Sequence, residues 1–318
     1  MLTTYQNMAR LGVVHFMAFA GLSQGEGPIM ETLEQLAADE FFTAVEMRRP
    51  LNAALAKDIA ALLGGAHMDV GVGAQPALLG GKLNLNALDE GERQKAVAEV
   101  RQSIDFAYRV GARICAVLTG PDPGAGKREQ ALEQLRRSLV ELCRYASQKA
   151  TGYELWVSLE TFDRDIDKKC LLGPSLESAD LAAKVKESVS NFGLLVDLSH
   201  LPLLKEDITE ALTVTADHLI HVHAGNCVMR DASDPAYGDQ HPPFGIPQGE
   251  NGVEELREFI ESLIYVGYFS KAVPTSKPFF TFEVKPLPGM SSAAALGNIK
   301  RTFLEAWAGV GGGLGASA

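Results

Sequence analysis

The segment "GLLVDLSHLPLLKEDITEALTVTADHLIHVHAGN", residues 193–226, contains two short apolar runs separated by a helical pattern. Residues 193–197 and 218–223 are rich in Leu, Ile and Val, which is typical of buried strands. Residues 203–214 lie between them and follow the spacing of a helix. Two neighbouring strands joined by a helix run parallel, because a parallel pair needs a long crossover connection. The segment therefore predicts one strand–helix–strand unit of a parallel sheet.

The same alternation extends over the whole chain. Strand-like runs occupy residues 11–20, 41–47, 68–74, 113–119, 154–160, 193–197, 218–223 and 279–285. Helical patterns occupy residues 29–38, 51–63, 88–110, 127–149, 176–189, 203–214, 252–265 and 291–307. Eight such units predict an α/β fold with a single (β/α)8 TIM barrel over residues 1–308, and a doubly wound open sheet is the alternative. We expect an extended loop after strand 7, over 225–250, and a disordered Gly-rich tail over 309–318.

Composition limits the classes of partner. The 318 residues carry a net charge of −11, whereas binding to nucleic acid needs a basic surface. The four cysteines form no CxxC motif and are typical of reduced thiols in a cytoplasmic protein. The apolar run 11–20 has features of a secretory signal, but the count of eight strands requires it as the first strand. We therefore expect a cytoplasmic protein with no nucleic-acid or membrane partner, and a homo-oligomer is left open.

Four predicted strands carry an acidic or imidazole side chain at or near their last residue: Glu160, Asp197, His223 and Glu283. In a barrel these ends meet at the C-terminal mouth, where barrel active sites are built. Three carboxylates brought together repel one another unless a cation neutralises them. We therefore expect these residues to bind one divalent metal ion, Mn²⁺, Mg²⁺, Co²⁺ or Zn²⁺. His221 lies one pleat deeper on the face of His223 and is expected to support it by hydrogen bonding.

At this point the sequence resembles the xylose isomerase-like barrel superfamily, which includes sugar epimerases and the family 2 apurinic endonucleases. The resemblance rests on "SLE" at 158–160, "VDLSH" at 196–200, "HVHAGN" at 221–226 and "FEVKP" at 282–286. It implies the same four metal ligands and makes Glu160 and Glu283 the catalytic acid/base pair. It also implies that His200 contacts a substrate oxygen. Asp239 and His241 in "YGDQHPPFG" would join His200 in binding substrate or, alternatively, in holding a second metal ion.

The function implied is a metal-dependent isomerase or epimerase of a ketose or keto-sugar acid. One carboxylate removes a carbon-bound proton, and the metal stabilises the resulting enediolate. A sugar lyase or dehydratase on the same barrel is the alternative. Two further hypotheses are an endonuclease-like phosphodiesterase and a non-catalytic sugar-binding barrel. The endonuclease hypothesis is weakened because the third and fourth strands lack the histidines by which the family 2 endonucleases bind further metal.

Further candidates for substrate recognition come from loops and other strand ends. The loop 225–250 is too long for an ordinary connection and is expected to form a wall of the substrate pocket. Recognition of a carboxylate or phosphate is assigned to Arg230 and His241 in this loop and to Lys285, which shares the predicted strand face of Glu283. The other candidate substrate contacts at the mouth are His15, Glu46 and Gln75.

Overall fold

The protein forms a parallel barrel of eight strands, as the alternating pattern predicts. A computed structural model describes residues 4–311. The strands follow the order β1-β8-β7-β6-β5-β4-β3-β2. They are β1 (Arg10–Val13), β2 (Ala44–Met47), β3 (Asp69–Gly73), β4 (Ile114–Leu118), β5 (Trp156–Glu160), β6 (Phe192–Asp197), β7 (Leu219–Gly225) and β8 (Phe279–Glu283). The barrel closes between β1 and β2 through a bridge between Val14 and Glu46, and Thr43 N donates to Leu11 O at 2.8 Å.

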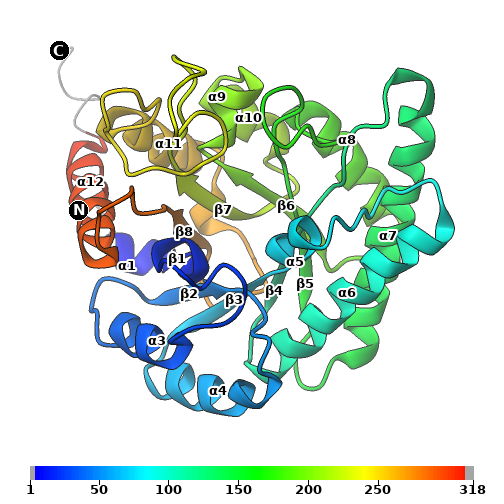
Figure 1. Ribbon diagram of the computed structural model, residues 1–318, viewed down its shortest axis with the longest axis horizontal. Helices are drawn as coiled ribbons and strands as arrows, with labels where there is room; N and C mark the ends of the chain where they lie inside the picture. Colours follow the sequence, from blue (N-terminus) through cyan, green and yellow to red (C-terminus); the bar gives the residue numbers. More distant parts are fainter. Residues whose placement is uncertain (1–3, 312–318) are drawn as a thin grey trace.

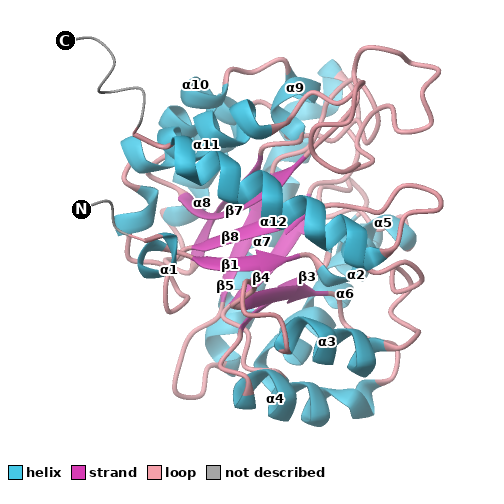
Figure 2. Ribbon diagram, turned by 90° about the vertical axis from the view of Figure 1, so that its left-hand side faces the viewer, coloured by secondary structure: helices cyan, strands magenta, loops and turns pink. Residues whose placement is uncertain are grey.

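Helices surround the strands on the outside of the barrel (Figure 1). Figure 2 shows the strands enclosed between α3 and α4 on one side and α10 and α11 on the other. The α-helices are α1 (Tyr5–Met8), α2 (His15–Ala18), α3 (Ile29–Ala37), α4 (Ala56–Gly65), α5 (Gln75–Gly80), α6 (Glu90–Arg109), α7 (Arg128–Lys149), α8 (Ser175–Lys186), α9 (His200–Leu204), α10 (Ile208–Thr215), α11 (Val253–Tyr265) and α12 (Ser292–Gly309). Short 3-10 turns occupy Ala53–Leu55, Ala125–Lys127 and Tyr268–Ser270. No helix of the described residues is both long and apolar enough to cross a membrane.

Strand β8 shows how the alternation of side chains separates the core from the barrel interior. Phe280 and Phe282 face outward and pack against Phe303 of α12, with ring centroids 5.7 and 5.5 Å apart. The alternate residues, including Thr281 and Glu283, face inward. The buried aromatic layer between strand and helix thus holds β8 in a register that directs Glu283 into the barrel.

Several element boundaries differ from the sequence prediction, including the following three. The predicted strand 11–20 ends at Val13, because Val14 N makes the last ladder bond to Phe282 O and the chain then turns into α2. The predicted helix 203–214 is two helices, since Lys205 adopts a left-handed conformation and the Asp207 side chain caps α10. The eighth strand ends at Glu283 instead of Lys285.

The segment between β7 and α11 follows the prediction. No helix and no multi-residue strand interrupts the chain between β7 and α11, which confirms the extended loop after strand 7. Of the predicted tail 309–318, Gly309 ends α12, and residues 312–318 lie outside the described residues.

A register shift between β6 and β7 brings two predicted ligands opposite each other. Leu194 pairs with Leu219, but the next pair is Leu195 with His221, so Ile220 is an extra residue. Beyond this irregularity Asp197 pairs with His223. The neighbouring position must be glycine, because a Cβ on Gly193 would lie 2.6 Å from Ile220 Cγ2 and 2.7 Å from His218 O. The shift therefore aligns an aspartate and a histidine that a regular ladder would offset by one residue.

Candidate metal and substrate site

The four strand-end residues predicted as metal ligands lie together at the C-terminal mouth of the barrel. Glu160, Asp197 and Glu283 are the last residues of β5, β6 and β8, and His223 lies two residues before the end of β7. His223 Nδ1 is at the centre of the group, 2.8 Å from Glu283 Oε2, 3.4 Å from Glu160 Oε1 and 4.0 Å from Asp197 Oδ2. One potential ligand atom from each residue lies within 4.8 Å of all the others.

The donor atoms of this group fit a divalent cation. Glu160 Oε1, Asp197 Oδ2 and His223 Nδ1 are buried, and none of them makes a contact of hydrogen-bond geometry within residues 4–311. Buried polar atoms are almost always hydrogen-bonded, so three unpaired polar atoms that lie close together require an explanation. Three carboxylate oxygens and one imidazole nitrogen form a donor set that Mn²⁺, Mg²⁺, Co²⁺ and Zn²⁺ accept. A cation here would satisfy all three atoms and offset the repulsion among the carboxylates.

Without a cation, bound protons offset part of the repulsion among the carboxylates. Burial alone would lower the pKa of His223, but the carboxylates of Glu46, Glu160 and Glu283 outweigh it and raise that pKa well above its usual value. Burial raises the pKa of Glu160. Burial would also raise the pKa of Glu283, but the charges of His241 and His223 lower it. In the metal-free site, a proton on His223 therefore provides the positive charge that the carboxylates demand.

A second cluster combines the other three residues predicted to bind substrate or a second ion. Asp239 Oδ1 lies 3.1 Å from His200 Nε2 and 2.7 Å from His241 Nε2. Despite burial, which alone would lower them, nearby carboxylates raise the pKa of His200 to about 10 and that of His241 to about 9. Lys168 Nζ is 3.1 Å from Asp239 Oδ2. The carboxylate of Asp239 is thus already surrounded by three groups that can carry positive charge.

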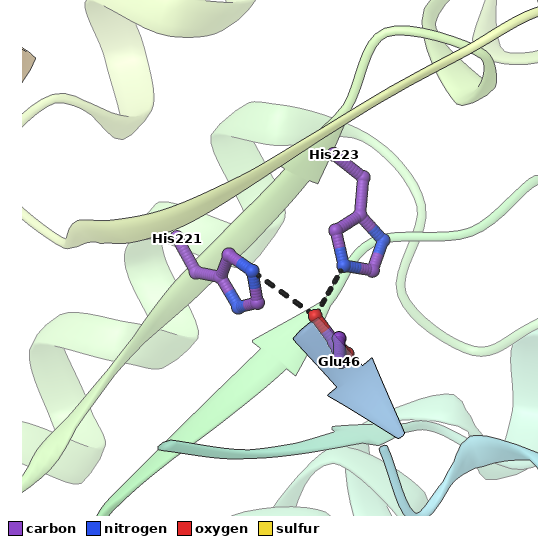
Figure 3. A group of neighbouring side chains, drawn as sticks. All are labelled: Glu46, His221 and His223. Atoms are coloured by element: carbon purple, nitrogen blue, oxygen red, sulfur yellow. Dashed lines mark hydrogen bonds and ion pairs between the residues drawn. The ribbon is translucent and has the colours of Figure 1, made fainter. Parts of the chain in front are cut away.

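Gln75 and Glu46 lie at the mouth, as predicted, and each contacts a predicted ligand. The amide Nε2 of Gln75, at the start of α5, donates to Glu160 Oε2 at 2.7 Å. Glu46 on β2 is buried, and its Oε2 lies 2.9 Å from His223 Nε2 and 3.2 Å from His221 Nε2 (Figure 3). The structure therefore brings His221 next to His223, as expected from the alternation along β7.

A cavity of about 230 Å³ opens onto these side chains. Its walls include Glu160, His223 and Glu283, and further residues that the sequence reasoning missed: Phe16, Phe162 and Lys168. Phe162 and Lys168 belong to the irregular segment that follows β5, where no periodicity indicates which side chains face the mouth. Phe16 was missed because α2 replaces the predicted continuation of the first strand.

Sequence comparison places the fold and the motifs in a family. A model described as "Xylose isomerase-like TIM barrel" matches residues 33–295. The chain belongs to this family. The resemblance drawn from the four strand-end motifs is confirmed. A search of curated protein sequences gives no significant match.

Solved structures share the family barrel at low sequence identity. A D-tagatose 3-epimerase-like protein is 19% identical, with a TM-score of 0.65 over 93% of this chain and 97% of its own. A family 2 AP endonuclease from Brucella melitensis is 17% identical, with a TM-score of 0.66 over 92% and 99%. The IolI protein with a bound zinc atom is 14% identical, with a TM-score of 0.66 over 93% and 97%. These likenesses show a shared fold.

Three further residues predicted to contact the substrate lie at the rim of the cavity or away from it. His15 is not among the cavity walls, because it begins α2 and its Nε2 lies 2.8 Å from Thr32 Oγ1. Arg230 is 61% exposed, faces Glu250 and does not line the cavity. Lys285 lies in the loop after β8, is exposed and reaches the rim of the cavity.

Proposed function

We propose that the protein is a divalent-metal-dependent isomerase or epimerase that acts on a ketose or keto-sugar acid. The observation that carries this proposal is the pair Glu160 and Glu283, two carboxylates within 3.4 Å of one imidazole nitrogen at the wall of one cavity. Glu160, Asp197, His223 and Glu283 would hold the ion. When bound, the ion would act as a Lewis acid that polarises the substrate carbonyl.

The chain itself supplies two groups that can move a proton on carbon. We propose that one of Glu160 and Glu283 removes the proton beside the carbonyl and the other returns a proton. The hydrogen bond from Gln75 stabilises the ionised form of Glu160, which is the form that accepts a proton. Asp197 is buried and accepts from Ser199 N at 2.7 Å, so it is held in place as a ligand.

The surroundings of Asp239 favour a substrate-binding role for the second cluster over a second ion. Lys168, His200 and His241 already supply positive charge to this carboxylate, so a further cation would be repelled. We propose that His200 and His241 hold substrate hydroxyl oxygens. Lys168 and Lys285 at the same cavity would favour a substrate that carries an anionic group, such as a keto-sugar acid.

Exchange of carbon-bound hydrogen with solvent tests this function. The protein loaded with Mn²⁺ is incubated in D₂O with a panel of ketoses and keto-sugar acids, and recovered sugar is examined by NMR. Deuterium at the carbon beside the carbonyl, with a sugar product, supports the proposal. An unsaturated product with loss of substrate indicates the lyase or dehydratase instead. No exchange with any sugar, in protein that holds the metal, contradicts both.

Variants connect the exchange to the two carboxylates. Glu160→Gln and Glu283→Gln each remove one acid/base group, so we expect the exchange rate to fall by about 10²–10⁴-fold. Glu305→Gln is the matched control, because Glu305 is an exposed glutamate on α12. Exchange that survives both site variants at the wild-type rate would show that other groups move the proton.

A further inference from the structure

One carboxylate oxygen joins two histidines across the barrel. Glu46 comes from β2, and His221 and His223 come from β7 (Figure 3). Glu46 Oε2 lies 2.9 Å from His223 Nε2 and 3.2 Å from His221 Nε2. All three side chains are at most 1% exposed. A contact this deeply buried between distant strands sets the orientation of the groups that make it.

The contact decides which nitrogen of His223 faces the proposed metal ligands. A carboxylate accepts hydrogen bonds, so an imidazole Nε2 at 2.9 Å must carry the proton. In the neutral ring, Nδ1 then keeps its lone pair. Nδ1 is the nitrogen that lies 2.8 Å from Glu283 Oε2 and 3.4 Å from Glu160 Oε1.

We propose that Glu46 and His221 are positioning residues that hold the His223 ring with Nδ1 toward the carboxylate group, so that His223 binds the metal ion through Nδ1. This inference rests on the proposed metal-dependent function. It assigns Glu46 a different role from the substrate contact expected from the sequence. Hydrogen-bonded carboxylates behind a metal-binding histidine fix its tautomer and raise its affinity for the ion.

His221 completes this arrangement by holding Glu46. Its ring stands edge-on to His223, with centroids 4.9 Å apart at 88°, and edge-on to Phe279 at 5.7 Å. His221 Nε2 also lies 3.3 Å from Thr281 Oγ1. The ring is therefore fixed by packing on β7 and β8, and its Nε2 keeps the shared oxygen of Glu46 close to His223.

Metal titration of matched variants tests the proposal. Binding of Zn²⁺ to the metal-free full chain is measured by calorimetry for wild type, Glu46→Gln, His221→Phe and the surface control Glu305→Gln. We expect one ion per chain in all four. Glu46→Gln should weaken binding by about 10–100-fold, and His221→Phe should weaken it less, because His223 keeps its own bond to Glu46. The control should match wild type.

A second measurement locates the proton on the His223 ring. In metal-free ¹⁵N-histidine-labelled protein, at a pH above the pKa of His223, NMR should show the one remaining ring proton on Nε2 in wild type and a mixture of tautomers in Glu46→Gln. Unchanged tautomer and metal affinity in Glu46→Gln, with weakened sugar binding, would make Glu46 a substrate contact and overturn the proposal. Two ions in wild type and one in Glu46→Gln would make Glu46 a metal ligand and also overturn it.

The metal-dependent function and the positioning role of Glu46 can be refuted separately. A folded wild-type chain that binds no ion would refute the proposed metal-dependent function. In that chain, the position of the ring proton at a pH above the pKa of His223 would then test the positioning by Glu46 alone, since Glu46→Gln should allow this proton to leave Nε2 for Nδ1. Circular dichroism and thermal unfolding of each variant confirm that the compared chains are folded.

Discussion

Protons and metal ions should compete for His223, and this competition gives a metal affinity that depends on pH. The carboxylates around His223 raise its pKa well above the usual value of 6.5, so the metal-free ring is protonated through the neutral range. A ligand must lose that proton to bind the ion. One proton displaced per ion means that the metal dissociation constant falls about tenfold for each unit of pH increase. That slope corresponds to about 1.4 kcal/mol per unit.

The size of the slope also counts the ions. If a second ion bound at His200 and His241, whose pKa values are raised to about 10 and about 9, two further protons would leave. Calorimetry in two buffers of different ionisation enthalpy, between pH 6 and 8, measures the protons released. We expect about one per chain, and none attributable to the site in His223→Asn. A dissociation constant that does not change over this range would refute the assignment of His223 as a protonated ligand.

Three other perturbations test separate parts of the structure. Burial lowers the pKa of His15 from 6.5 to about 3, so below pH 6.5 the unfolded chain accepts a proton that the folded chain refuses, and stability falls as pH falls. Between neutral pH and pH 5, the free energy of unfolding of wild type should fall by about 2 kcal/mol from this cause, and urea unfolding of His15→Gln should not show this fall. An equal pH dependence of the unfolding free energy in both chains would contradict the prediction. Gly193→Ala should lower the free energy of unfolding by about 1–3 kcal/mol, because the added Cβ would clash with the carbonyl oxygen of His218. An unchanged free energy of unfolding in a denaturant titration would contradict the close packing at the register shift between β6 and β7. Lys285→Ala should raise KM about tenfold for keto-sugar acids and leave KM for neutral ketoses unchanged in steady-state kinetics. An equal change of KM for both substrate classes would show that Lys285 does not recognise an anionic group.

The barrel and its central cluster were predictable because both depend on local patterns. Apolar runs alternating with helices indicate parallel strands, and parallel strands place their C-terminal ends at one mouth. Glu160, Asp197 and Glu283 end their strands in the structure, and His223 lies near the end of its strand, as expected. These positions follow from sequence alone because each residue directly continues an apolar run.

Residues whose place depends on tertiary contacts were not predictable in this way. His15 was expected at the mouth from strand alternation, but the chain turns into α2 after Val14 and directs the ring to Thr32. Lys168 reaches Asp239 from an irregular loop, where no periodicity sets the direction of a side chain. The contact of Glu46 with His223 joins residues 177 positions apart, and no pattern along the chain encodes it.

The most direct test of the account is a crystal structure of the protein grown with Zn²⁺, with the anomalous signal used to locate the ion. We predict one strong peak among Glu160, Asp197, Glu283 and Nδ1 of His223, at about 2.0–2.2 Å from its ligand atoms. A peak on the Nε2 side of His223, between Glu46 and His221, would contradict both the ligand set and the orientation of the ring. A fully folded barrel with no peak at the strand ends would contradict the metal site itself.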